Sequence, residues 1–388
     1  MTASRDDKVV RLSRFGDWTP LKPLCQSGHL PGMRPFYAGP NVENRMALVR
    51  EMINYIRIHW NEYPTFMRSL REFIIKSGVD LSAEEDFAQK AEALLRSSKN
   101  WADQVKQSNT DDYSAIRLYT SLTGYERIFR TINGAFREDD LTKQREALQA
   151  AVFLVELLTI DLFNYCIANP AADNFSGCVY RGMCVSEDEL KQLSALANGP
   201  ISERYLSIPL GMASASADRE KALTFAFEEA ARISACPVLW VIHVAGLRPE
   251  LLTPYLQQFP NSIVTSICAV PIDDLSDYRD EQEVLLRGPF FQLVRVRENG
   301  ARYGGRRIPV IEVLMLNSNR DHVSSVFLKD SEANSARDLF KALVHIERAT
   351  QCARLAKKYG LLADAKAYTS IRAQSQASVD KLYRRPWQ

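Results

Sequence analysis

The chain lacks the uninterrupted apolar run that a membrane-spanning helix requires. Its most apolar segment, residues 150–163, already contains Glu156 and Asp161, whereas about 18 consecutive apolar residues are needed to cross a bilayer. The amino terminus carries Arg5 and Asp7 with no apolar run behind them, which is not typical of a secretory signal. We therefore expect residues 150–163 to form a buried helix. We also expect a soluble protein without a membrane partner, either cytoplasmic or delivered into another cell without a Sec signal.

Paired cysteines and the common nucleotide, hydrolase and zinc motifs are also missing. The seven cysteines are an odd number, widely spaced, with no Cys-x-x-Cys pair and no histidine at ligand spacing. The chain has no Gly-x-Gly-x-x-Gly, no phosphate loop ending in Gly-Lys-Ser/Thr, no Gly-x-Ser-x-Gly and no His-Glu-x-x-His. These absences argue against a zinc site and against dehydrogenase, P-loop, serine-hydrolase and zinc-protease functions. We expect reduced core thiols and no metal ion.

No charge of one sign dominates the chain. The 49 Lys and Arg residues oppose 47 Asp and Glu residues, which leaves a net charge of +2, so a nucleic-acid partner is not expected. The basic excess is local, because the chain from Ser331 to its end carries 11 Lys plus Arg against 5 Asp plus Glu, a difference of +6. With 46% hydrophobic residues, the composition indicates a protein that can bury a full core.

Sequence patterns divide the chain into four regions. Residues 1–42 hold five prolines, which block regular hydrogen bonding and predict an irregular, extended segment. Residues 43–104 have apolar positions every three or four residues and predict a small helical unit, in which Ser82 and Glu85 form a capping box. Residues 105–325 predict a mixed domain, and residues 326–388 a basic helical extension.

Within residues 105–325 the pattern changes from helix to strand. Helical periodicity covers residues 111–137 and 148–162, and one further helix is predicted over residues 218–230. Short runs rich in β-branched and aromatic residues, bounded by Gly and Pro, predict strands at residues 179–181, 238–244, 283–286, 290–296 and 308–316. Because helices and strands do not alternate strictly, the pattern favours an α+β fold over a doubly wound one.

Three short segments of this domain carry side chains suited to catalysis. They are Tyr180-Arg181-Gly182 at a predicted strand, Ser214-Ala215-Ser216 followed by Ala222-Leu223-Thr224-Phe225-Ala226, and Glu281-Gln282-Glu283 at the opening of a strand. Taken singly, each segment is commonly a turn, a solvated strand face or surface charge. Their order, spacing and strand context together indicate one site.

The three segments resemble those of the mono-ADP-ribosyltransferases of the Arg-Ser-Glu class, which includes clostridial binary-toxin enzymes and vertebrate arginine-specific ectoenzymes. Family members carry an Arg on the first core strand, a Ser-Thr-Ser motif ahead of a helix and a Glu-x-Glu on a later strand; here Ala215 replaces the Thr. The resemblance covers about residues 105–320. It implies an α+β fold of two packed, mainly antiparallel sheets with flanking helices. The upstream stretches similar to the family's helical signature are Ala115 to Thr120, Tyr125, Ile132-Asn133 and Phe136-Arg137.

The resemblance implies NAD as co-substrate and gives roles to the residues. Arg181 is expected to hold the diphosphate by paired charge-assisted hydrogen bonds, with Gly182 letting the ligand approach the backbone. Glu283 is expected to stabilise an oxocarbenium-like ribose, and Ser214 to bond that glutamate or the ribose. Glu281 is expected to orient an acceptor arginine and help deprotonate it. Alternation along a strand puts Glu281 and Glu283 on one face if Glu281 belongs to the strand or its extended entry, and their close packing can raise one pKa.

Aromatic and polar residues complete the implied site. Phe225 is expected to stack on nicotinamide, and Tyr278 matches the aromatic residue of the family's substrate-recognition turn. Tyr119, Tyr125 and Asn133 are expected on the adenosine side. The alternatives are helix-core packing for Phe225, an ordinary loop aromatic for Tyr278, and core packing or capping for the other three.

The expected function is transfer of ADP-ribose from NAD to an arginine side chain of a protein, with nicotinamide as leaving group. The alternatives are an NAD glycohydrolase, transfer to a non-arginine acceptor, or an inactive fold that serves as a binding module. The terminal helical regions either dock a target or regulator or pack as scaffold. Residues 300–307, with three arginines, are either a mobile basic loop or a solvated hairpin tip.

Overall fold

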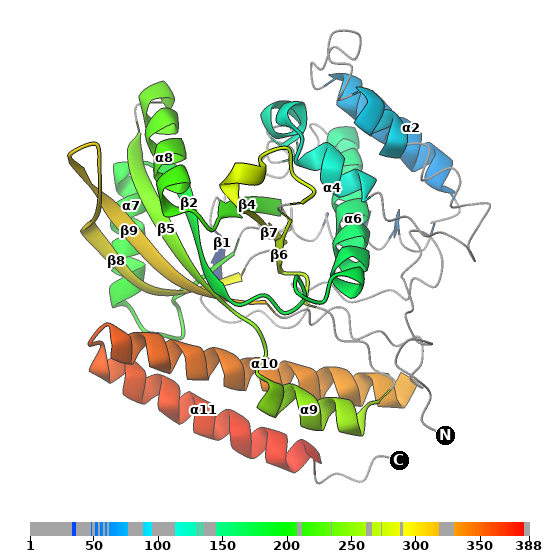
Figure 1. Ribbon diagram of the computed structural model, residues 1–388. Helices are drawn as coiled ribbons and strands as arrows, with labels where there is room; N and C mark the ends of the chain where they lie inside the picture. The colour runs from blue at the N-terminus through cyan, green and yellow to red at the C-terminus, as the bar shows by residue number, and fades with distance from the viewer. Residues whose placement is uncertain are drawn as a thin grey trace.

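The computed structural model describes most of the chain from residue 113 onward and parts of the region before it (Figure 1). The described residues are 33–35, 48, 51–52, 55–56, 59, 62–76, 88–94, 113–129, 132, 135, 145–207, 212–233, 235–260, 266–272, 274–287, 290–317 and 330–383. The predicted capping box of Ser82 and Glu85 lies outside them, as do Asn133 and the Phe136-Arg137 pair.

Nine strands of the described chain form one hydrogen-bonded sheet in the order β1-β3-β8-β9-β5-β2-β4-β7-β6. The strands are β1 (Met33–Pro35), β2 (Gly177–Val185), β3 (Tyr205–Ser207), β4 (Met212–Ser216), β5 (Cys236–Ala245), β6 (Ala269–Pro271), β7 (Glu283–Arg287), β8 (Phe290–Tyr303) and β9 (Arg306–Leu316). The β1–β3 and β5–β9 pairs are parallel, and the other pairs are antiparallel. The α+β class and the mainly antiparallel pairing are thus confirmed.

The sheet divides into two parts at one point. Strands β2 and β4 share a single registered pair, Tyr180 with Ser216, whereas β2 and β5 are paired along the whole of β2. The three-stranded part β4-β7-β6 therefore turns away from the six-stranded part (Figure 1). The two expected sheets are these two parts, joined by one pair of residues.

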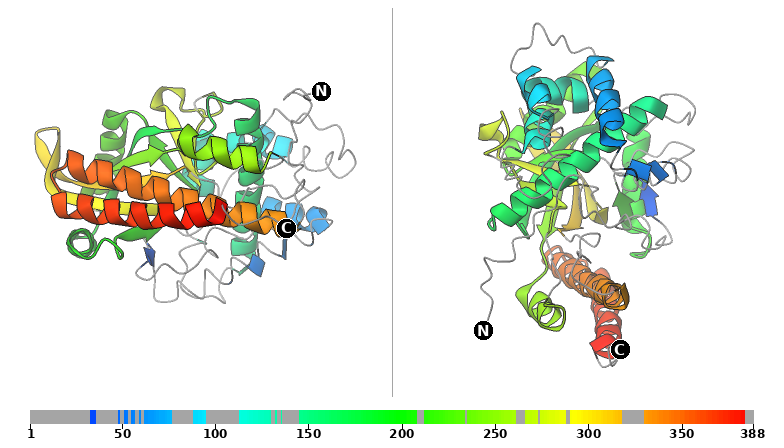
Figure 2. Two further views of the ribbon diagram at one scale, coloured as in Figure 1. Left: turned by 90° about the horizontal axis from the view of Figure 1, so that it is seen from below. Right: turned by 90° about the vertical axis from the view of Figure 1, so that its right-hand side faces the viewer.

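Helices flank both parts of the sheet. They are α2 (Tyr63–Lys76), α4 (Ser114–Tyr119), the π-helix η4 (Gly124–Phe129), α6 (Arg145–Ala168), α7 (Glu187–Asn198), α8 (Arg219–Ile233), α9 (Pro249–Gln258), the 3₁₀ turn η5 (Arg279–Glu281), α10 (Asp330–Lys358) and α11 (Leu362–Tyr383). Helices α4 and α6 lie beside the three-stranded part, and α10 and α11 lie side by side beneath the six-stranded part (Figures 1 and 2).

The expected buried helix is α6. Its Glu156 is 4% exposed and its Asp161 is 1% exposed, so both carboxyl groups are inside the protein. Asp161 accepts a hydrogen bond of 2.7 Å from the backbone N–H of Ala115 in the first turn of α4, where a negative charge also stabilises the helix dipole. No helix in the described part of the chain combines the length and the apolar character needed to cross a membrane.

The amino-terminal region shares its core with the rest of the molecule. Buried side chains of α2 and of the helical segment 88–94 belong to the same hydrophobic cluster as those of α4 and α6. Residues 33–35, expected to be irregular, form an edge strand instead, where Pro35 is tolerated because an edge N–H is not required. The described side chains of α2 and of segment 88–94 therefore pack against the rest of the molecule, as the scaffold alternative expects.

The carboxy-terminal helices are a hairpin, joined by ion pairs to the segments before β3 and α9. Arg204 contacts Asp364 of α11 at 2.6 Å, and Arg248 contacts the fully buried Glu347 of α10 at 2.7 Å. Gly360, with a φ of 74°, lies between the two helices. The described residues of this region are helical over 330–358 and 362–383, as the sequence predicts for them.

Residues 300–307 form a solvated hairpin tip. Strands β8 and β9 pair up to Tyr303 and Arg306, and Gly304 and Gly305 make the turn with φ values of 54° and 80°, a conformation that favours glycine. The three arginines of the segment are exposed. Of the two alternatives from the sequence, the hairpin tip is the one observed.

The feature of the fold that places the site is the crossing of α8 over β2. A Cβ atom at Gly182 would overlap the carbonyl oxygen of Ala222 and the backbone nitrogen of Ala226. Glycine at this position therefore admits the helix backbone. The expected role of Gly182 in letting a ligand approach the backbone stays a prediction.

Gly182→Ala is expected to lower the free energy of unfolding by about 1–3 kcal/mol, the usual cost of forcing extra atoms into a packed contact. Urea denaturation measures this change. Gly199→Ala is the matched control, because a Cβ there meets its nearest atom at 3.4 Å, an ordinary contact, and its effect should stay within about 0.5 kcal/mol. Equal stability of the two variants would contradict the close crossing.

Candidate functional site

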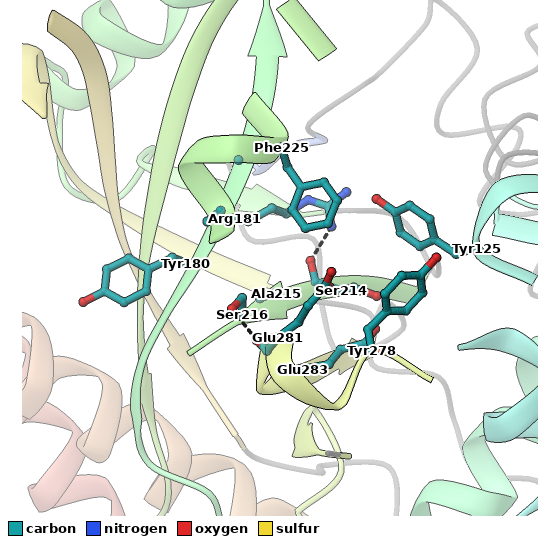
Figure 3. A pocket seen from close by; sticks show the side chains of 12 residues that line it. Tyr125, Tyr180, Arg181, Ser214, Ala215, Ser216, Phe225, Tyr278, Glu281 and Glu283 are labelled. Atoms are coloured by element: carbon teal, nitrogen blue, oxygen red, sulfur yellow. Dashed lines mark hydrogen bonds between the residues drawn. The ribbon is translucent and has the colours of Figure 1, made fainter. Parts of the chain in front are cut away.

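A cleft at the junction of the two sheet parts brings the predicted motifs together (Figure 3). It encloses about 550 Å³, including space open to solvent. Strands β2 and β4, helix α8, the turn before β7 and the π-helix η4 contribute its walls. The lining residues are Tyr125, Tyr180, Arg181, Gly182, Ser214, Ala215, Ser216, Ala222, Phe225, Tyr278, Glu281 and Glu283.

Arg181 points into the cleft from the middle of β2, and its neighbour Tyr180 points to the other side (Figure 3), as alternation along a strand requires. One terminal nitrogen of Arg181 donates a hydrogen bond to the backbone carbonyl of Ser214. Its Nε is buried and has no hydrogen-bond partner among the described residues. A guanidinium that donates from one nitrogen keeps further N–H donors for a ligand. A buried donor without an acceptor costs free energy until a ligand accepts its hydrogen bond.

The two serines of β4 have different environments. The hydroxyl of Ser214 is buried and has no partner within the described part of the chain. The hydroxyl of Ser216 donates to the backbone carbonyl of Glu281 and accepts from the backbone N–H of Asp218 at 2.9 Å. Ser216 thus ties the turn before β7 to the start of α8, a function that the Ser-x-Ser pattern did not reveal.

Glu283 begins β7 and is 6% exposed. Its Oε2 accepts a hydrogen bond of 2.6 Å from the hydroxyl of Ser276. The serine hydrogen-bonded to this glutamate is thus Ser276, whereas bonding of Ser214 to the ribose stays a prediction. No sequence motif identifies Ser276, which lies seven residues before Glu283 in an irregular turn.

Glu281 reaches the same cleft by a different backbone path from the one expected. It ends the 3₁₀ turn η5, and Gln282 then adopts a left-handed conformation with a φ of 47°. The alternation of an extended strand therefore does not apply to Glu281 and Glu283. Both carboxyl groups nevertheless line the cleft, because the left-handed residue turns the chain between them.

The Glu281 carboxyl group has a pKa raised to about 7. Burial of the group is the largest cause, and the nearby Glu283 carboxylate adds to it, whereas Lys221 opposes the shift. Both main causes disfavour a second negative charge in the cleft. The expectation that one of the paired acids has a raised pKa is confirmed, with Glu281 as that acid.

Aromatic rings form one side of the cleft. Tyr125 lies with its ring centroid 5.9 Å from that of Tyr278, 6.3 Å from Phe225 and 5.5 Å from Phe129. Phe225 and Arg181 both line the cleft, and Tyr125 and Tyr278 lie on the opposite wall (Figure 3). The guanidinium carbon of Arg181 lies 5.9 Å from the ring centroid of Phe129. Phe225 and Tyr278 are thus placed in the cleft, and the side chain of Phe225 does not serve only as helix core.

Tyr119 differs from its expected place. It is 2% exposed and does not line the cleft, so core packing describes it. Burial raises its pKa well above the usual tyrosine value; the charge of Arg181 opposes this shift and that of Glu283 adds to it. Tyr125, six residues further on in η4, is the residue of this signature that lines the cleft.

No group of three or more His, Cys, Asp or Glu side chains within the described ranges is arranged to hold a metal ion. The six cysteines of that part of the chain are free thiols.

The Glu283 charge is expected to maintain part of the raised Glu281 pKa. Glu283→Gln should lower the pKa of Glu281, because the repelling carboxylate is lost, and Lys221→Met should raise it, because an attracting charge is lost. Carbon-detected NMR titration of the Glu281 carboxyl measures both shifts. Identical midpoints in all three proteins would contradict the electrostatic coupling.

The raised pKa also predicts a stability profile. A carboxyl that titrates near 4.5 when unfolded and near 7 when folded stabilises the fold fully below pH 4.5, and this stabilisation is lost as the pH rises through 7. The free energy of unfolding of the wild type should therefore fall relative to Glu281→Gln between pH 5 and pH 8. Parallel urea-denaturation series test this, and a wild-type advantage that grows with pH would overturn it.

Among known proteins, the chain is similar to several solved structures. No protein-family model and no curated protein matches the chain. The Vis toxin, an ADP-ribosyltransferase from Vibrio splendidus, is 18% identical over 60% of this chain and 85% of its own, with a TM-score of 0.33. Plx2a, an ADP-ribosyltransferase toxin from Paenibacillus larvae, is 17% identical over 59% of this chain and 96% of its own, with a TM-score of 0.34.

The type III effector XopAI from Xanthomonas axonopodis pv. citri is 14% identical over 71% of this chain and 93% of its own, with a TM-score of 0.36. Because all three identities are under 25% and all three TM-scores under 0.5, residue roles rest on this chain's own geometry. The family that the sequence resembles is represented among these solved structures: the chain is similar to ADP-ribosyltransferase toxins.

Proposed function

We propose that this chain transfers ADP-ribose from NAD to an arginine side chain of a protein and releases nicotinamide. The observation that carries the proposal is the convergence of Arg181, Phe225, Glu281 and Glu283 in one cleft, although they come from three separate segments of the sequence. We assign this activity to residues 105–325, with the two terminal regions as flanking structure.

The unpaired polar atoms of the cleft suit a dinucleotide. The buried Nε of Arg181 and the buried hydroxyl of Ser214 have no partner among the described residues, and buried polar groups are normally satisfied in the working state. A guanidinium matches the diphosphate in charge and geometry. A serine hydroxyl matches a ribose hydroxyl. The ring of Phe225, which lines the same cleft, offers a face for the planar nicotinamide.

Cleavage of the nicotinamide–ribose bond leaves positive charge on the sugar. Nicotinamide departs as a neutral ring with the electron pair of the broken C–N bond, and C1′ of the ribose becomes oxocarbenium-like. The Glu283 carboxylate, fixed by the Ser276 hydroxyl, is placed to stabilise that charge. Because the carboxylate is fixed before the charge develops, the cleft pays little reorganisation energy during the reaction.

The acceptor arginine completes the transfer. One guanidinium nitrogen forms the new bond to C1′, and its proton passes to the Glu281 carboxylate. A carboxylate with a pKa of about 7 is a stronger base than an ordinary glutamate, which supports this role. We infer that transfer to arginine increases as the pH rises through 7, since only ionised Glu281 accepts the proton.

Nicotinamide release from NAD, with and without agmatine as an arginine mimic, tests the proposal. The wild type should release more nicotinamide with agmatine. Glu283→Gln should reduce all release on the order of 10²-fold, as expected for loss of a transition-state contact. Glu281→Gln should remove the agmatine-dependent part only. Glu298→Gln, which alters an exposed carboxylate of β8, is the matched control and should keep wild-type rates.

The other outcomes separate the alternatives. Release that does not respond to agmatine would replace arginine transfer by NAD hydrolysis or by transfer to another acceptor. Absence of both release and NAD binding in calorimetry would replace the enzyme by a binding module.

A further inference from the structure

The turn between β6 and β7 carries two cleft residues, Tyr278 and Glu281. The same turn carries a buried serine, Ser276, two residues before Tyr278. Ser276 is 2% exposed. Its hydroxyl donates to Oε2 of Glu283 at 2.6 Å and accepts from the backbone N–H of Tyr278 at 3.1 Å. Its own backbone N–H donates to the carbonyl of Ile272 at 3.1 Å. With the acceptor side of the hydroxyl occupied, its single proton is directed at Glu283.

The next residue ties the turn to the amino-terminal part of the chain. Lys90 contacts both carboxylate oxygens of Asp277, at 2.7 and 2.9 Å, and the Lys90 side chain is only 19% exposed. The backbone N–H of Leu122 donates to the same carboxylate at 3.3 Å. Asp277 is therefore held from two segments that lie far away in the sequence.

The position of Lys90 is set by the packing of its helical segment against the core. Lys90 belongs to the helical segment 88–94, whose Ala91 and Leu94 are 5% and 0% exposed. These two side chains belong to the same hydrophobic cluster as Ile272 and Leu275 at the base of the turn. The segment and the turn thus share both a core and an ion pair, so movement of one requires movement of the other.

A second ion pair contacts the turn and differs in character. Lys221 of α8 meets Asp280 at 2.6 Å, but these side chains are 38% and 75% exposed, and exposed pairs of this kind restrain little. The Lys90–Asp277 pair is less exposed and is backed by the shared core. It is therefore the stronger restraint on the position of Ser276.

We propose that Ser276 is the positioning residue for Glu283 and that the Lys90–Asp277 ion pair keeps Ser276 in place, which makes helical segment 88–94 part of the catalytic machinery. The inference rests on the proposed function, because Glu283 is its catalytic group. It assigns to the amino-terminal region a direct effect on turnover, beyond scaffold packing. A regulator that displaced segment 88–94 would lower turnover without touching NAD.

Steady-state nicotinamide release by the full chain tests the role of Ser276. Ser276→Ala should lower kcat on the order of tenfold to a hundredfold, the usual cost of a misplaced catalytic group. The KM for NAD should change little, since Arg181 and Phe225 are untouched. Ser276→Thr keeps the hydroxyl and should restore most of kcat. Unchanged kcat in Ser276→Ala, or a loss confined to KM, would overturn the proposal.

The Lys90–Asp277 ion pair, called the clamp below, is tested by variants of its two residues. Lys90→Met and Asp277→Asn should each lower kcat several-fold, and the double variant should be no worse than either, because both remove the same contact. Arg204→Met is the matched control: it breaks a buried ion pair between the core and the other terminal region, with Asp364, and should lower stability while leaving kcat unchanged. Additive losses, or an equal loss in the control, would contradict the clamp.

Hydrogen–deuterium exchange gives a readout that needs no turnover. In Lys90→Met the amides of residues 274–281 should exchange faster than in the wild type, and in Arg204→Met they should not. Unchanged exchange in Lys90→Met would overturn the clamp even if the wild type released no nicotinamide. Faster exchange together with an inactive wild type would instead leave the clamp standing and reject the proposed function.

Discussion

The backbone of helix α8 crosses strand β2 at Gly182 so closely that no Cβ atom fits between them. This contact places Phe225 of the helix and Arg181 of the strand in the same cleft (Figure 3). The start of the helix is then joined through Ser216 to the carbonyl of Glu281. One close approach of two backbones thus fixes the helix wall of the cleft, and a chain of hydrogen bonds extends from it to the paired acids.

The acids differ because their surroundings differ. Glu283 is buried and receives a hydrogen bond from Ser276, which stabilises a carboxylate. Glu281 lies beside Glu283 and has a pKa raised to about 7, chiefly by burial. Two acids with separated tasks, one fixed as a charge and one able to take a proton near neutral pH, are what transfer to a basic acceptor requires.

The sequence was sufficient where the signal is local. The strand that holds Arg181 follows from its β-branched and aromatic composition, and the helices that hold Phe225 and the buried carboxyl groups of α6 follow from the local sequence pattern; all three are observed. It was insufficient where the signal is a contact between distant segments. Ser276 has no motif, and Gly182 serves helix packing, which only the three-dimensional crossing reveals. The left-handed Gln282 likewise broke the alternation on which the Glu281 prediction depended.

The proposed reaction joins ADP-ribose to a guanidinium group in this cleft. Mass spectrometry of the products formed from NAD and agmatine by the full chain tests it most directly. We expect an ADP-ribosyl-agmatine adduct in an amount equal to the agmatine-dependent part of the nicotinamide release, with the adduct absent from Glu281→Gln. Free ADP-ribose as the sole sugar product of the wild type, at every agmatine concentration, would contradict it.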